Sequence, residues 1–157
     1  MTNLLEDKTI LLGVTGSIAA YKAVDLASKL MQAGAQVDTI LTENAAQFVT
    51  PLTFRSITHR PVITNLFDLD SEDAIEHVAL SQRADILVVA PASAHTLAKL
   101  ALGLADNALT AVALATSAPL LVAPAMDANM WEHPTVQEPV SYTHLRAHET
   151  RHALVCR

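Results

Sequence analysis

Four short segments of the sequence carry polar side chains that could do chemistry, and in three of them these side chains lie near glycine or proline, where a chain commonly turns around a ligand. They are GVTGSIAAYK (13–22), HVAL (77–80), APASAHT (90–96) and APAMDANMWEHP (123–134). In the first segment, Ser17 opens a predicted helix after two glycines. Glycine lets a phosphate approach the backbone, and the helix N-terminus attracts anions. The spacing is neither G-x-G-x-x-G nor a P-loop, so it indicates neither a dinucleotide nor ATP, and a tight turn with a helix cap is the alternative.

The two middle segments offer a base and a group of hydroxyls. His77 titrates near neutral pH and can take a proton from a substrate, although a lone histidine is more often structural or exposed. Ser93, His95 and Thr96 crowd the start of a predicted helix. Serine or threonine at such a place most often serves as an N-cap.

The fourth segment holds one acid among large apolar side chains. Asp127 lies between Met126 and Met130, and Trp131 follows. We weigh two interpretations: Asp127 caps a helix while its neighbours pack in the core, or the segment forms the floor of a site in which Asp127 takes part in chemistry.

Alternating strand and helix patterns position these segments. Continuous apolar runs predict strands at 8–14, 36–42, 85–92 and 118–125, and a short one at 61–65. Helical spacing predicts helices over 17–34, 43–49, 51–58, 77–84 and 94–116, the last as one or two helices, with an acidic loop at 66–76. This alternation predicts an α/β fold: a single domain with a Rossmann-like (flavodoxin-like) parallel sheet and helices on both faces. Because ligands bind at the carboxyl ends of such strands, the four segments meet at one edge of the sheet.

Composition narrows the function classes. The 157 residues are 51% hydrophobic and carry a net charge of −6 without any basic run, which argues against a nucleic-acid or anionic membrane surface. No apolar stretch reaches the ~18 residues of a membrane helix, and the N-terminus lacks a signal-peptide pattern. We expect a cytoplasmic protein that binds no metal.

The last residues differ from the rest. From Pro139 onward the composition becomes rich in histidine and arginine without a periodic apolar face. His144, His148 and His152 have a spacing that would suit a metal on a helix. However, VSYTHLRAHET (140–150) is, letter for letter, what one frame of a transposon-type sequencing adapter encodes. We therefore expect residues 1–138 to be the evolved domain, truncated at its C-terminus, and 139–157 to be a non-native tail in which Cys156 has no role.

Taken together, the motifs resemble the flavin-dependent cysteine decarboxylases over about residues 6–138. GVTGSIAAYKA, LTENAAQFVTPLTF, HVAL, ADILVVAPASAHTLAKLALGLADNALT and APAMDANMWEHP occur in that family's order. The closest likeness is to the branch that acts on 4′-phosphopantothenoylcysteine in coenzyme A biosynthesis. The resemblance implies FMN as cofactor and a homotrimer with flavin at the subunit interface. It also implies fusion in the full-length protein to a phosphopantothenate–cysteine ligase domain.

The resemblance also implies roles for individual residues. His77 matches the base, and Asp127 and Met130 fall in the substrate segment. Residues matching the flavin site are Gly16, Ser17, Ile18, Thr42, Ser93, Ala94, His95, Thr96, Ala125 and Met126. The implied activity is that of an FMN-dependent carboxy-lyase: flavin oxidation of the substrate to a thioaldehyde, loss of CO2, and re-reduction.

The sequence departs from the family pattern at three places that bear on the implied activity. The cysteine of a later clamp segment, which assists re-reduction, is absent. His95 stands where the family has Asn. Asp127 also replaces Asn, and it would repel a substrate carboxylate by about 4 kcal/mol at ~4 Å and an effective dielectric constant near 20.

Other readings remain open. A peptidyl-cysteine decarboxylase and a flavin prenyltransferase belong to the same superfamily, although HVAL and PAMDANM disfavour the latter. A non-catalytic flavoprotein that keeps the fold is an alternative of a different class.

Overall fold

The computed structural model describes residues 4–66 and 76–142, without the side chains of 76–78 and 139–142. In these ranges strands and helices alternate along the chain, as the apolar pattern predicts. The strands are β1 (Thr9–Val14), β2 (Gln36–Leu41), β3 (Val62–Ile63), β4 (Ile86–Ala92) and β5 (Leu120–Pro124). The helices are α1 (Ala20–Gln32), the 3-10 turn η1 (Ala45–Gln47), α2 (Pro51–Thr58), α3 (Glu76–Arg83), α4 (Ala94–Leu102), α5 (Ala108–Ala115), α6 (Ala128–Glu132) and α7 (Pro134–Tyr142).

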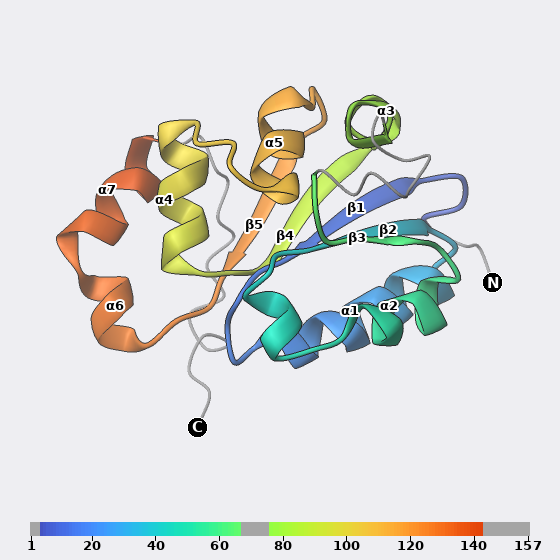
Figure 1. Cartoon of the computed structure of the whole chain (residues 1–157), viewed down its shortest axis with the longest axis horizontal. Helices are drawn as coiled ribbons and strands as arrows, with labels where there is room; N and C mark the ends of the chain where they lie inside the picture. Colours follow the sequence, from blue (N-terminus) through green and yellow to red (C-terminus); the bar gives the residue numbers. More distant parts are fainter. Residues whose placement is uncertain (1–3, 67–75, 143–157) are drawn as a thin grey trace.

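The described strands form one parallel sheet in the order β3-β2-β1-β4-β5. This is the 3-2-1-4-5 order of the Rossmann arrangement, in which the chain reverses its direction of travel across the sheet between β1 and β4. Helices α1 and α2 cover one face, and α3, α4 and α5 lie on the other (Figure 1). The α/β prediction is confirmed.

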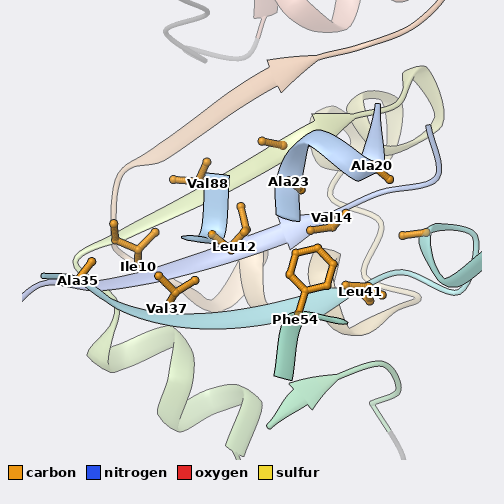
Figure 2. Close-up of a cluster of buried hydrophobic side chains, with 13 residues drawn as sticks. Ile10, Leu12, Val14, Ala20, Ala23, Ala35, Val37, Leu41, Phe54 and Val88 are labelled. Atoms are coloured by element: carbon orange, nitrogen blue, oxygen red, sulfur yellow. The ribbon is translucent and has the colours of Figure 1, made fainter. Parts of the chain in front are cut away.

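Small residues let α1 approach the sheet closely. Ala20, Ala23 and Ala27 are buried against β1 and β2, and Figure 2 shows the ring of Phe54 beside the same strands. On the opposite face, Gly13 makes room for α5, because a Cβ there would lie 2.4 Å from Leu109 Cδ1. Both helix layers thus pack directly on β1, which carries the first site loop.

Two helical predictions need correction, and one is made definite. The helix expected from Ser17 begins at Ala20, since residues 17–19 form a turn that is used by the site. Residues 43–49 contain only the turn η1. The 94–116 pattern, predicted as one or two helices, is two, separated at Gly103, whose φ of 68° ends α4 in the left-handed conformation.

Some boundaries lie beyond what the structure tests. Most of the predicted acidic loop at 66–76 falls outside the described residues. Helix α7 continues to Tyr142, across the predicted boundary at residue 138, and the rest of the predicted tail is not described. The division of the chain at 138 therefore stays a prediction. None of the described helices is long and apolar enough to cross a membrane.

A buried acid ties β2 to two neighbouring elements. Asp38 is 4% exposed, and its Oδ2 accepts hydrogen bonds of 3.2 Å from Arg60, after α2, and from Arg83, at the end of α3. Arg60 also bonds the other carboxylate oxygen through Nε. This ion pair lies in the amino-terminal half of β2, away from the site loops, and its role is structural.

Candidate functional site

The loops that follow β1 and β4 are joined through one buried hydroxyl. Thr15 Oγ1 donates to the Pro91 carbonyl at 2.6 Å and accepts from the Ser93 amide at 2.9 Å. The Thr15 amide donates to the same Pro91 carbonyl at 3.3 Å. Thr15 is not among the predicted site residues, because its partners are distant in the chain and nothing local marks them.

The β1 loop is also tied to the end of β5. Ser17 Oγ donates to the Ala125 carbonyl at 3.1 Å and accepts from the Ala19 amide at 3.3 Å. The Ala125 amide in turn donates to the Ala92 carbonyl at 3.0 Å. Three of the four predicted segments therefore meet at the carboxyl edge of the sheet, beside the β1–β4 switch point where α/β proteins bind ligands.

Gly16 brings the loop after β2 into the same place. A Cβ on Gly16 would lie 2.5 Å from the Cβ of Asn44, so any other residue would force these two loops apart. Thr42 directly follows β2, and its hydroxyl accepts from the Ala45 amide at 3.2 Å. Both residues were predicted site residues, and the structure brings them together.

The start of α4 presents hydrogen-bond donors to this edge. Ser93 is the N-cap, as predicted: its Oγ accepts from the Thr96 amide at 3.3 Å and donates to Thr96 Oγ1 at 3.2 Å. The amides of Ala94 and His95, at the first helical positions, have no acceptor within the helix. The helix N-terminus adds partial positive charge, which favours an anion.

Two adjoining hollows lie over these loops, and both include Gly16 and Ser93. The first, called the polar hollow, has a volume of about 260 Å³ and is lined by Gly16, Thr42, Glu43, Asn44, Ser93, His95, Thr96, Lys99, Asp106 and Asn107. The second, called the apolar hollow, has a volume of about 460 Å³ and is lined by Gly16, Ser17, Ile18, Ala19, Phe48, Ser93, Ala94, Ala125, Met126, Asp127, Ala128 and Met130. Every predicted flavin-site residue lines one or both of them.

A salt bridge on the wall of the polar hollow was not predicted. Lys99 Nζ donates to both carboxylate oxygens of Asp106, at 2.8 and 2.7 Å, and the Lys99 side chain is 13% exposed. The hydrogen bond from Lys99 holds the pKa of Asp106 below its usual value. Asn107 then begins α5 with a capping box to Thr110. The wall of the hollow is thus anchored at the α4–α5 junction.

The position of Asp127 bears on both interpretations that the sequence left open. It is the N-cap of α6, and its Oδ1 accepts from the Asn129 amide at 2.9 Å. It also lines the apolar hollow together with Met126 and Met130. The capping interpretation is confirmed, whereas a part for Asp127 in chemistry stays a prediction.

His77 is the one predicted site residue that the structure does not place in this constellation. Its backbone belongs to the first turn of α3, but its side chain is outside the described part of the chain. Its role as a base stays a prediction. Among the described residues no cluster of acidic, histidine or cysteine side chains could hold a metal ion.

Comparison with known proteins identifies the family. The sequence profile of the Flavoprotein family matches residues 2–149. The chain is 45% identical over 138 residues to the coenzyme A biosynthesis bifunctional protein CoaBC of Bacillus subtilis strain 168, covering 88% of this chain and 34% of that protein. It is 46% identical over 136 residues to a probable phosphopantothenoylcysteine decarboxylase of Streptococcus mutans, covering 85% of this chain and 76% of that protein.

Solved structures of cysteine decarboxylases resemble this chain as well. The FMN-dependent cysteine decarboxylase SpaF superposes with a TM-score of 0.81 at 35% identity, covering 88% of this chain and 79% of that one. A PPC decarboxylase complexed with pantothenoylaminoethenethiol gives 0.77 at 33% identity, covering 86% and 76%. The chain spans about a third of the length of the bifunctional relatives and three quarters of the single-function relative. On its sequence and its fold, this chain belongs to the Flavoprotein family.

Proposed function

We propose that this chain is the FMN-binding decarboxylase part of a coenzyme A biosynthesis enzyme and removes CO2 from the cysteinyl carboxylate of 4′-phosphopantothenoylcysteine. The observation that carries the proposal is the pair of hollows at the switch point of the sheet, one rich in donors and one apolar. The names of the relatives support the substrate.

The polar hollow suits the phosphate of FMN. The hydroxyls of Thr42 and Thr96 each accept a hydrogen bond within the protein, so their own protons are left to donate to a ligand. The amides of Ala94 and His95 and the third N–H of Lys99 add further donors on the same side. Gly16 lets the ligand approach the backbone closely, and a Cβ at this position would collide with Asn44.

The apolar hollow suits the flavin ring and the thiol substrate. Ile18, Phe48, Met126 and Met130 give it apolar walls, and Ala125 at the end of β5 leaves room for a flat ring. Such a site orients the reacting atoms and excludes water from them. The hydrogen bond from Ser17 to the Ala125 carbonyl holds two walls of this hollow together.

When bound, FMN supplies the electron sink that lets CO2 leave from a carbon next to the thiol-bearing one. The protein contributes a base and the geometry. We assign the base to His77, whose imidazole can accept a proton at neutral pH. Asp127 keeps its position through the α6 cap and contacts the substrate at the carboxylate end.

The remaining assignments are part of the same proposal. We place the full-length protein in the cytoplasm, as a homotrimer with FMN near the subunit contact, and we expect a phosphopantothenate–cysteine ligase domain in it. Exposed apolar side chains beside the hollow support self-association: Ile18 is 66% exposed and Tyr21 58% exposed. The length of the bifunctional relatives supports the additional domain.

A substrate comparison tests the proposal. The protein is reconstituted with FMN, and CO2 release is measured from 4′-phosphopantothenoylcysteine and from a peptide ending in cysteine. We expect release from the first at a rate well above the second. Faster release from the peptide would assign the chain to the peptidyl-cysteine branch, and FMN binding without release from either would favour the non-catalytic flavoprotein.

A further inference from the structure

The apolar hollow contains a single ionisable side chain. Of the residues that line it, Asp127 alone carries a charge, and none of the described lining residues is a lysine, arginine or histidine. A ligand that enters this hollow therefore meets a negative charge with no lining cation to offset it.

The Asp127 carboxylate is held in place by only one of its oxygens. Oδ1 accepts from the Asn129 amide at 2.9 Å, and the Asp127 carbonyl accepts from Trp131 at 3.0 Å. Within the described part of the chain, no donor is bonded to Oδ2. One oxygen is thus fixed by the cap of α6, while the other can meet a ligand.

We propose that Asp127 determines the charge selectivity of the apolar hollow, so that a ligand with a carboxylate binds more weakly than the same ligand without it. Two like charges about 4 Å apart repel, and the repulsion grows as water is excluded from the hollow. The inference rests on the proposed function for its choice of ligands. It makes Asp127 a specificity-determining residue that favours the decarboxylated product over the substrate.

Asparagine is the appropriate replacement. It has the size of aspartate and caps helices equally well, so Asp127→Asn keeps α6 and changes only the charge and one donor. Glu132→Gln is the matched control, because Glu132 ends the same helix, lies outside the lining of both hollows, and gives the same change in net charge.

Binding is measured without turnover. The ligands are 4′-phosphopantothenoylserine and 4′-phosphopantothenoylethanolamine, which carry a hydroxyl in place of the reactive thiol and differ from one another only in the carboxylate. Calorimetric titration of the FMN-loaded parent, Asp127→Asn and Glu132→Gln at pH 8 gives the ratio of the two dissociation constants for each protein.

We expect the serine ligand to bind the parent about tenfold or more weakly than the ethanolamine ligand. Asp127→Asn should reduce this ratio by about tenfold or more, and Glu132→Gln should leave it within about twofold. An equal ratio in the parent and Asp127→Asn, or no binding of either ligand to any variant, would overturn the inference. Failure of the proposed function would appear separately, as no CO2 release from the thiol substrate by either the parent or Asp127→Asn.

Discussion

The Thr15 hydroxyl connects the first and fourth strands by accepting from the Ser93 amide at 2.9 Å while donating to the Pro91 carbonyl at 2.6 Å. Thr15 is fully buried, and its single hydroxyl makes both the bond to the Ser93 amide and the bond to the Pro91 carbonyl. The hydrogen bond fixes the β1 loop relative to the N-terminus of α4. The two sides of the proposed phosphate site therefore have a defined separation.

Thr15→Val should destabilise the protein by about 1–3 kcal/mol, because the side chain keeps its shape but leaves the partly buried Ser93 amide without its acceptor. FMN affinity should fall as well. Thr39→Val is the matched control: Thr39 is fully buried in β2, and its hydroxyl has no partner among the described residues. Removing that hydroxyl should be neutral or stabilising. Urea unfolding of the parent and the two variants measures both changes in the free energy of unfolding. Equal losses of stability from the two variants would refute the role of Thr15.

Gly16→Ala should lower FMN affinity by about tenfold or more, since the added methyl would stand 2.5 Å from Asn44 Cβ and push the β1 and β2 loops apart. Gly103→Ala serves as comparison. Its Cβ meets nothing within 4 Å, and only its φ of 68° opposes the change. It should cost about 1 kcal/mol of stability and leave FMN binding unchanged. Fluorescence titration with FMN distinguishes the two, and wild-type affinity in Gly16→Ala would contradict the close approach.

Arg60→Met should lower the free energy of unfolding by about 2–3 kcal/mol. The change removes the closer partner of a nearly buried carboxylate, although Arg83 still contacts Asp38. Lys29→Met breaks an ion pair with Asp25 whose two side chains are well exposed, and it should cost less than about 0.5 kcal/mol. Chemical denaturation at neutral pH compares them. A loss from Lys29→Met as large as that from Arg60→Met would contradict the importance of burial.

The stabilising effect of Asp106 should depend on pH. The hydrogen bond from Lys99 lowers the pKa of Asp106 in the folded protein below the value of 3.8 that it has without such a partner. A lowered folded pKa means that the contribution is complete above pH 3.8 and is lost as the pH falls through the folded pKa. The stability difference between the parent and Asp106→Asn should therefore shrink on acidification below pH 3.8. In a Lys99→Met background most of that pH dependence should disappear, and its full persistence there would assign the effect to another group.

Local patterns in the sequence predicted most of the fold and part of the site. The continuous apolar runs marked the strands because a parallel sheet covered on both faces needs apolar side chains in every position. Ser93 and Asp127 were recognisable as caps from their position before helices.

What the sequence did not reveal depends on tertiary contacts. Ser17 looked like a helix start, yet its hydroxyl bonds Ala125 and the helix begins at Ala20. The bond between Thr15 and Pro91 joins residues 76 positions apart. Lys99 and Asp106 fall within the single predicted stretch 94–116, and their ion pair forms because Gly103 ends α4 and the chain turns back. A helix after Asp127 was expected only through its cap, without bounds, and α7 was not predicted.

Release of CO2 from 4′-phosphopantothenoylcysteine tests the central claim most directly. It is measured with the purified protein before and after loading with FMN, and with the FMN-loaded His77→Asn variant. We expect release that requires FMN and that His77→Asn slows by about 100-fold or more, the usual contribution of a general base. Release that is independent of FMN, or as fast in His77→Asn as in the parent, would contradict the claim.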